Sequence, residues 1–195
     1  MEVTTLSYDN LHNHGQLFAN MFRARHRTFI QQSKWDLPQA NGMEFDQYDT
    51  PASRWVAVHR HGVVMAGVRL TPTTHKCGIY SYMIRDAQMG LLETIPQDLL
   101  QFKAPVDENI WESSRVFVSD LVPANERLRV QMQLIHEMVV SARNLGATTL
   151  LGIIPEFGPR LARRVGLDCQ PVGPVMDTGG MKSVCVSISM ATKLH

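Results

Sequence analysis

The sequence predicts an α/β domain, a three-layer αβα sandwich around a mixed, mainly antiparallel sheet. Three observations predict it. Apolar side chains recur at helical spacing between residues 11 and 32, and two apolar strands separated by a turn follow at 54–70. A long amphipathic helix at 125–145 then leads into a continuous apolar run at 148–154, which is typical of a buried central strand. Alternating helices and strands of this kind build layered α/β folds.

The first expected helix, over 11–32, carries a charged residue on its apolar face. Phe18, Phe22, Arg25 and Phe29 follow one another at i, i+4, i+7 and i+11, so they form one stripe. Arg25 therefore interrupts an apolar face. A guanidinium is costly there unless an anion or a carboxylate meets it.

An irregular, polar and acidic stretch at 34–51 predicts a long loop after this helix. A hairpin follows, with strands at 54–59 and 63–70 and a turn near His61-Gly62. Arg69 lies near the end of the second strand.

The middle of the chain gives weaker signals. Residues 78–84 predict another strand, and 88–100 predict one or two short helical turns interrupted by Pro96. Residues 109–119 predict a strand that carries Glu112 and Arg115.

The C-terminal third gives the clearest helix, at 125–145, with Gly146 as its end. After the buried strand at 148–154 we expect a short helix at 159–165 and a final strand at 183–190.

The composition is that of an ordinary globular protein, and we expect one domain over residues 1–195. The chain is 44% hydrophobic and 19% charged, with a formal net charge of +1. This charge does not favour a general nucleic-acid binder, and the sequence shows neither a signal peptide nor a membrane-spanning segment. Cys77, Cys169 and Cys185 are far apart, so neither a disulfide framework nor a zinc site is expected. The interpretation is a cytoplasmic protein without a metal.

The expected loop at 34–51 mixes carboxylates with aromatic side chains. Carboxylates beside an aromatic face suit a small cationic ligand, through ion pairing and cation–π attraction. Charge alone also fits a solvated loop. An arginine that pairs with the loop would explain Arg69 as well. The residues of this mixture are Trp35, Asp36, Glu44, Phe45, Asp46, Tyr48 and Asp49.

Glu112 and Arg115 are three residues apart, which in a regular strand places them on opposite faces. If both serve one site, the strand must bulge between them, and bulges are frequent beside active sites. An exposed ion pair is the alternative.

Arg160, Arg163 and Arg164 lie at i, i+3 and i+4 and form a basic stripe on the short helix at 159–165. A solvated face and a docking surface for an acidic protein both fit this stripe.

These residues together resemble the acyl-homoserine-lactone (autoinducer) synthase family, in their order and in the spacing within the first segment. The resemblance is strong over 25–115 and only general beyond it. It includes the motif Val-Arg-Leu-x-Pro-Thr around Arg69. The matching residues are Arg25, Phe29, Trp35, Asp46, Asp49, Arg69, Glu112 and Arg115.

The resemblance implies a fold similar to the GCN5-related N-acetyltransferases and an acyltransferase that makes a quorum-sensing signal. S-adenosylmethionine and a fatty acyl group on acyl carrier protein or coenzyme A are the implied substrates. The methionine amine attacks the thioester, and the carboxylate then displaces methylthioadenosine to close the lactone. S-adenosylmethionine is consumed, so no cofactor is implied, and neither is a nucleic-acid or membrane partner.

The family's site residues carry over onto matching positions. Asp46 and Asp49 would hold the cationic parts of S-adenosylmethionine, with Arg69 as their counter-ion. The resemblance also implies that Arg25 and Phe29 help to build this pocket, and that Trp35 packs against the nucleoside or sulfonium.

The resemblance also implies roles in the reaction for two residues of the expected strand at 109–119, Glu112 and Arg115. Arg115 would position the substrate carboxylate or the acyl carbonyl. The amine must lose a proton before it attacks, and Glu112 is the candidate base.

Two positions depart from the family pattern. Val116, and only then Phe117, follows Arg115, where an aromatic residue often follows at once. Gly152 occupies a place where members that favour 3-oxo chains carry Thr, which favours an acyl chain unsubstituted at C3. We expect the acyl pocket between the strand 148–154 and the helix 125–145.

Two other functions remain possible on the residues alone. A GCN5-type N-acetyltransferase using acetyl-CoA usually presents a glycine-bearing loop to the pyrophosphate, and residues 118–125 contain no glycine. A non-catalytic small-ligand-binding domain explains the acidic aromatic loop, but has no need for Glu112 with Arg115.

Overall fold

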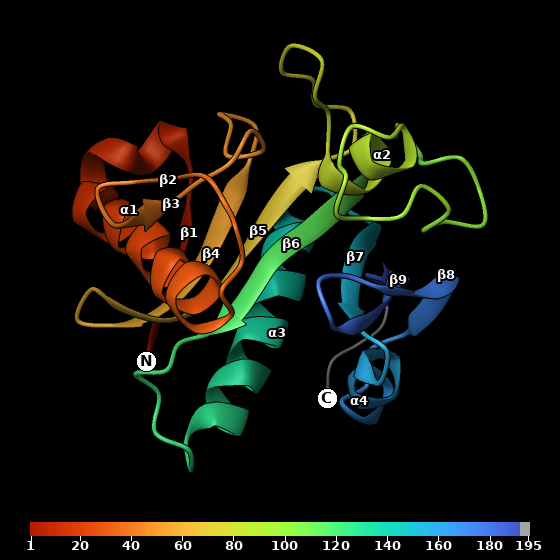
Figure 1. Ribbon diagram of the computed structural model, residues 1–195. Coiled ribbons are helices and arrows are strands. Elements are labelled where there is room, and N and C mark those ends of the chain that lie inside the picture. Colours follow the sequence, from red (N-terminus) through yellow and green to blue (C-terminus); the bar gives the residue numbers. More distant parts are fainter. Residues whose placement is uncertain (192–195) are drawn as a thin grey trace. The chain divides into compact units, whose positions relative to one another are not determined.

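The computed structural model describes residues 1–191, whose helices and strands are drawn in Figure 1. The chain divides into two compact units. The first unit contains Met1–Leu70 and Arg115–Ser141, and the second contains Thr71–Ser114 and Ala142–His195. Seven strands form a mixed, mainly antiparallel sheet in the order β1-β4-β5-β6-β7-β9-β8, in which β6 and β7 are parallel. The predicted fold class is confirmed. One domain over 1–195 stays a prediction.

The first unit begins with a strand, a long helix and a hairpin. Its elements are β1 (Glu2–Leu6), the 3-10 turn η1 (Tyr8–Asn10), α1 (Leu11–Arg25), the π-helical segment η2 (His26–Gln32), β2 (Gln39–Ala40), β3 (Met43–Glu44), β4 (Arg54–Arg60) and β5 (Val63–Pro72). It also holds the end of β6 (Ile110–Val118) and most of α3 (Arg127–Asn144). The predicted helix at 11–32 is thus confirmed in extent, but its last seven residues form a π-helix. The predicted turn is confirmed too, because His61 and Gly62 both have positive φ, as a two-residue hairpin turn requires.

Helices cover both faces of the sheet in the first unit. Leu6 of β1 packs in the core with α1, whereas the neighbouring Thr5 shares a 2.7 Å hydrogen bond with Ser141 of α3. Because successive strand residues point to opposite faces, α1 and α3 lie on opposite sides of the sheet. At Gly67 of β5 even one Cβ atom would lie 2.3 Å from Cε of Met21, so glycine lets α1 approach the sheet closely.

The second unit also has helices on both faces of its strands. It contains α2 (Met83–Gln88), β7 (Thr149–Pro155), α4 (Gly158–Arg164), β8 (Cys169–Asp177) and β9 (Lys182–Ser189). Residues of α2 share a core with Leu151 and Ile153 of β7. Gly158 of α4 lies against the side chain of Ile154, which points the other way.

Two expectations for the middle of the chain are wrong. No strand forms at 78–84, where a single bridge joins Cys77 and Tyr80 and α2 begins at Met83. Side chains explain this start, since Asp86 accepts hydrogen bonds from the backbone and hydroxyl of Ser81. The expected helical turns at 88–100 do not form either, because α2 ends at Gln88 and Gly90 follows with φ +77°.

The expectations also missed the two outermost strands, β1 and β8. β8 includes Pro171 and Pro174 and has a register shift against β9. Proline has no N–H to donate to a neighbouring strand, so it is tolerated in an edge strand but not in a central one. The two prolines also interrupt the alternation of apolar and polar residues by which a strand is predicted.

Within residues 1–191 no helix is both long and apolar enough to cross a membrane. The same residues contain no cluster of three or more His, Cys, Asp or Glu side chains that could hold a metal ion.

Candidate active site

The charged residue on the apolar face of α1 meets carboxylates, as its position required. Arg25 is fully buried, and its Nη1 and Nη2 donate to both oxygens of Asp49 at 2.6 and 2.9 Å. Its Nε donates to Glu44 Oε2 at 2.6 Å. A planar guanidinium is suited to such bidentate pairing.

Two further arginines pair with the same loop. Arg69 Nη1 lies 2.5 Å from Asp46 Oδ1 and 3.1 Å from Asp49 Oδ1. Arg115 Nε lies 3.2 Å from Glu44 Oε1, and its Nη2 lies 2.8 Å from Asp46 Oδ2. The expected partnership of an arginine with the acidic loop is confirmed.

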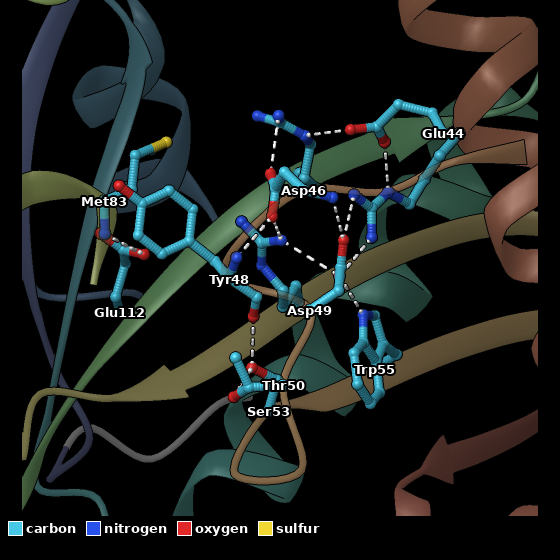
Figure 2. A network of polar contacts seen from close by, with 12 residues as sticks. Glu44, Asp46, Tyr48, Asp49, Thr50, Ser53, Trp55, Met83 and Glu112 are labelled. Carbon is cyan, nitrogen blue, oxygen red and sulfur yellow. Dashed lines mark hydrogen bonds and ion pairs between the residues drawn. The ribbon is translucent and has the colours of Figure 1, made fainter. Parts of the chain in front are cut away.

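The six charges form a closed, alternating ring, in which each arginine bridges two carboxylates and each carboxylate bridges two arginines. Figure 2 shows the three labelled carboxylates turned towards the guanidinium groups. Three positive and three negative charges cancel, which compensates for their burial. In order, the ring consists of Glu44, Arg25, Asp49, Arg69, Asp46 and Arg115.

Hydrogen bonds and charge hold Asp49 and Arg25 in their ionised forms. Asp49 also accepts from the indole Nε1 of Trp55 at 3.0 Å and from the amide of Asp46 at 2.8 Å. Burial alone would raise the pKa of the Asp49 carboxyl, but Arg69 and Arg25 outweigh it and hold that pKa well below its usual range. Burial would lower the pKa of Arg25, and Asp49 and Glu44 reverse this so that it is raised.

Aromatic side chains lie against two arginines of the charged ring, Arg115 and Arg69. Cζ of the Arg115 guanidinium lies 5.6 Å from the ring centroid of Phe29. Trp35 stacks on Phe29, with their ring centroids 5.2 Å apart. Tyr48 lies similarly against Arg69 at 5.5 Å. Cation–π contacts of this kind orient a guanidinium.

Arg115 is the most exposed member of the ring. Its side chain is 10% exposed, whereas no other member exceeds 5%. Among residues 1–191, Nε and Nη2 of Arg115 have ring partners and Nη1 has none. That nitrogen remains as a donor for a ligand.

The backbone of β6 departs from the extended conformation at Arg115, which has φ +54°. A residue other than glycine is strained there, at a cost of about 1–3 kcal/mol. The strand is therefore irregular at this position, and a site shared by Glu112 and Arg115 stays a prediction. The pairing of Arg115 with Glu44 and Asp46 holds the strained conformation in place.

Glu112, three residues earlier on β6, belongs to the second unit and has a different environment. It is fully buried, and its oxygens accept from the backbone amides of Met83 at 3.3 Å and Ile84 at 2.7 Å (Figure 2). Tyr82, at the N-cap position of α2, makes no side-chain capping bond. Glu112 therefore caps α2 from another strand, which satisfies amides that a helix N-terminus leaves unpaired.

The remaining predicted residues lie elsewhere in the second unit. Gly152 is buried in β7 and pairs with Ser113 of β6. Arg160, Arg163 and Arg164 are all exposed on α4. The basic stripe thus faces solvent.

Sequence reasoning missed the roles of two residues. Glu44 was one of several loop carboxylates, yet it joins Arg25 to Arg115. Ser113 carried no recognisable signal, although its side chain lies against Gly152.

Comparison with known proteins agrees with this arrangement. Residues 9–192 match a model of the autoinducer synthase family. The chain belongs to that family. The predicted enzyme class is confirmed, an acyltransferase of the acyl-homoserine-lactone synthase type.

Three relatives illustrate the similarity. An acyl-homoserine-lactone synthase of Pseudomonas aeruginosa is 29% identical over 175 residues, covering 88% of this chain and 78% of the relative. TofI, solved in a ternary complex with an inhibitor and MTA, is 26% identical with a TM-score of 0.75, over 97% of this chain and 92% of TofI. An acyl-CoA N-acyltransferase from Pseudomonas aeruginosa shares the fold alone, at 15% identity and a TM-score of 0.62 over 96% of this chain and 99% of that one.

Proposed function

We propose that this protein synthesises an N-acyl-L-homoserine lactone quorum-sensing signal from S-adenosylmethionine and an acyl thioester. The observation that carries the proposal is the charge-balanced ring of three arginines and three carboxylates, with Phe29 and Trp35 stacked beside Arg115. It is a site with both signs of charge and an aromatic wall. S-adenosylmethionine, with its sulfonium, ammonium and carboxylate, needs such a site.

The reaction has two steps. The methionine amine attacks the thioester carbonyl, the C–S bond breaks, and the carrier leaves as a thiol while an amide forms. The substrate carboxylate then attacks the γ carbon and displaces methylthioadenosine, which closes the lactone. One proton is released overall.

We assign Arg115 to the substrate carboxylate or the acyl carbonyl, because its Nη1 has no partner within residues 1–191. Trp35 and Phe29 would flank the sulfonium or nucleoside. Asp46 and Asp49 would position the arginines and attract the cationic groups of the substrate. Since both carboxylates already hold guanidiniums, a substrate cation would have to share them.

Arg25 and Arg69 complete the framework as fully buried counter-ions. Glu112 remains the candidate base. A carboxylate accepts up to about four hydrogen bonds, so its bonds to the amides of α2 are compatible with that role.

The acyl chain would lie against Gly152, and the donor would be acyl carrier protein or coenzyme A. The exposed stripe of Arg160, Arg163 and Arg164 suits an acidic carrier protein. Arg163→Glu should then raise KM for an acyl carrier protein donor and leave KM for the matching acyl-CoA nearly unchanged. Equal effects on both donors would contradict docking at this stripe.

We also propose a cytoplasmic location. Cys77 is exposed, Cys169 and Cys185 are buried, and all three are free thiols, as a reducing compartment favours. Recovery of the protein with the periplasmic fraction of fractionated cells would contradict it.

The test of the function is product analysis. The protein is incubated with S-adenosylmethionine and a panel of acyl carrier protein and coenzyme A thioesters, and products are identified by mass spectrometry. We expect methylthioadenosine and an acyl-homoserine lactone in equal amounts. Arg115→Gln should lower the rate of product formation at least about a hundredfold, because the contacts of Arg115 would position the reacting groups. Arg129→Gln, which changes a surface arginine, is the matched control. The proposal fails if no donor yields methylthioadenosine.

A further inference from the structure

One face of the paired strands β6 and β7 carries polar groups that the proposed reaction does not use. Trp111 pairs with Leu150, and Ser113 pairs with Gly152 in parallel register. Residues two apart on a strand point to the same face, so Trp111 and Ser113 share the face of Gly152.

The hydroxyl of Ser113 occupies the space that a side chain at position 152 would fill. A Cβ atom added to Gly152 would lie 2.7 Å from Ser113 Oγ and 3.2 Å from the Ser113 carbonyl oxygen. The absence of a side chain on β7 is thus matched by a hydroxyl contributed from β6. Position 152 itself has no hydroxyl, but the hydroxyl of Ser113 lies at the same place.

Both polar groups on this face are weakly used within the protein. Ser113 Oγ donates to the Leu151 carbonyl at 3.3 Å, which is long for an O–H···O bond. Trp111 is only 8% exposed, and its indole Nε1 has no hydrogen-bond acceptor among residues 1–191. Buried polar groups are nearly always paired, so this indole N–H is available to an acceptor that residues 1–191 do not supply.

We propose that Trp111 Nε1 and Ser113 Oγ form a polar subsite that binds an oxygen on C3 of the acyl chain. An indole N–H only donates and a serine hydroxyl can donate, so the pair suits the two lone pairs of a carbonyl oxygen. The enzyme therefore prefers 3-oxoacyl donors to unsubstituted donors of equal length. This inference rests on the proposed function, in which the acyl chain lies against Gly152, and it reverses the expectation drawn from Gly152 alone.

The test compares kcat/KM for a 3-oxoacyl thioester and the unsubstituted thioester of the same length, on the same carrier. In the unchanged enzyme we expect a ratio of about five in favour of the 3-oxo donor, the effect of about one net hydrogen bond. Ser113→Ala and Trp111→Phe should each lower that ratio about threefold or more. A substitution that only weakens folding lowers both rates together and leaves the ratio unchanged.

Ser114→Ala is the matched control, because Ser114 is equally buried but is the next residue on the strand and points to the other face. Its ratio should equal that of the unchanged enzyme. Ser113→Ala removes one atom, so this variant decides the outcome if Trp111→Phe does not fold.

A ratio near one in the unchanged enzyme, or a ratio unaltered in Ser113→Ala, overturns the subsite while methylthioadenosine release still supports the proposed function. If neither donor releases methylthioadenosine, the proposed function itself fails, and the subsite fails with it.

Discussion

Two buried carboxylate environments, one in each unit, show different ways to hold negative charge away from water. In the first unit Glu44, Asp46 and Asp49 are paired with guanidinium side chains. In the second unit Glu112 accepts bonds from the backbone amides of α2. The first arrangement depends on charges that a substitution can remove, whereas backbone amides stay wherever the helix stays.

The largest expected effect comes from removing a member of the ring. Arg25→Met should lower the free energy of unfolding by about 3–5 kcal/mol, because Asp49 and Glu44 would each lose a buried partner. Urea denaturation followed by circular dichroism measures this. Arg23→Met, an exposed position of the same helix, should change stability by less than about 0.5 kcal/mol. Equal effects at the two positions would show that the ring is energetically unimportant.

Glu112→Gln tests the amide-held carboxylate. One of its two acceptor oxygens becomes an NH₂ group facing an N–H, so we expect a loss of about 1–3 kcal/mol in unfolding free energy. Because Glu112 is the candidate base, we also expect Glu112→Gln to turn over more slowly and with an altered pH profile. Full turnover with the normal profile would exclude the base role, whatever the stability.

Acid should weaken the ring. The pKa of Asp49 is lowered in the folded protein, so its stabilising contribution is complete well above its unfolded pKa of about 3.9 and is lost as pH falls towards the folded value. Below about pH 4 the unfolding free energy should decline by up to about 1.4 kcal/mol per pH unit from this group. Unfolding in urea between pH 7 and pH 3 measures the slope, and Asp49→Asn should have a shallower one. An unchanged slope in that variant would rule out Asp49 as its source.

The smallest expected effect concerns an exposed pair. Arg129 lies 2.9 Å from Glu126, but its side chain is 68% exposed. Arg129→Ala should leave the urea midpoint of unfolding almost unchanged, and added salt should remove any remaining difference. A loss as large as that of Arg25→Met would contradict the distinction between buried and exposed ion pairs.

Hydrophobic periodicity was enough to predict α1, the β4–β5 hairpin, α3 and β7, because each buries a continuous apolar face. It failed at α2, where Ser81, Asp86 and Glu112 start a six-residue helix through specific hydrogen bonds. The bond from Ile84 to Glu112 joins positions 28 residues apart, and such bonds leave no periodic pattern.

The charged partners were predictable only in part. Arg25 on an apolar face indicated that a carboxylate must meet it, and Arg69 fitted the acidic loop. Which carboxylate pairs with which arginine depends on the path of the loop, and that path has no periodicity. The contact of Ser113 with Gly152 depends on the register of two strands, which one sequence does not specify.

The ring has a consequence for synthesis of the chain on the ribosome. Three carboxylates and two arginines of the ring lie between residues 25 and 69, and these five leave one negative charge without a partner. The sixth member, Arg115, is made 46 residues after Arg69. Domains generally fold as units during synthesis, N-terminal parts first. The ring reaches charge balance only when Arg115 emerges, so its completion must wait for a later stretch of the chain.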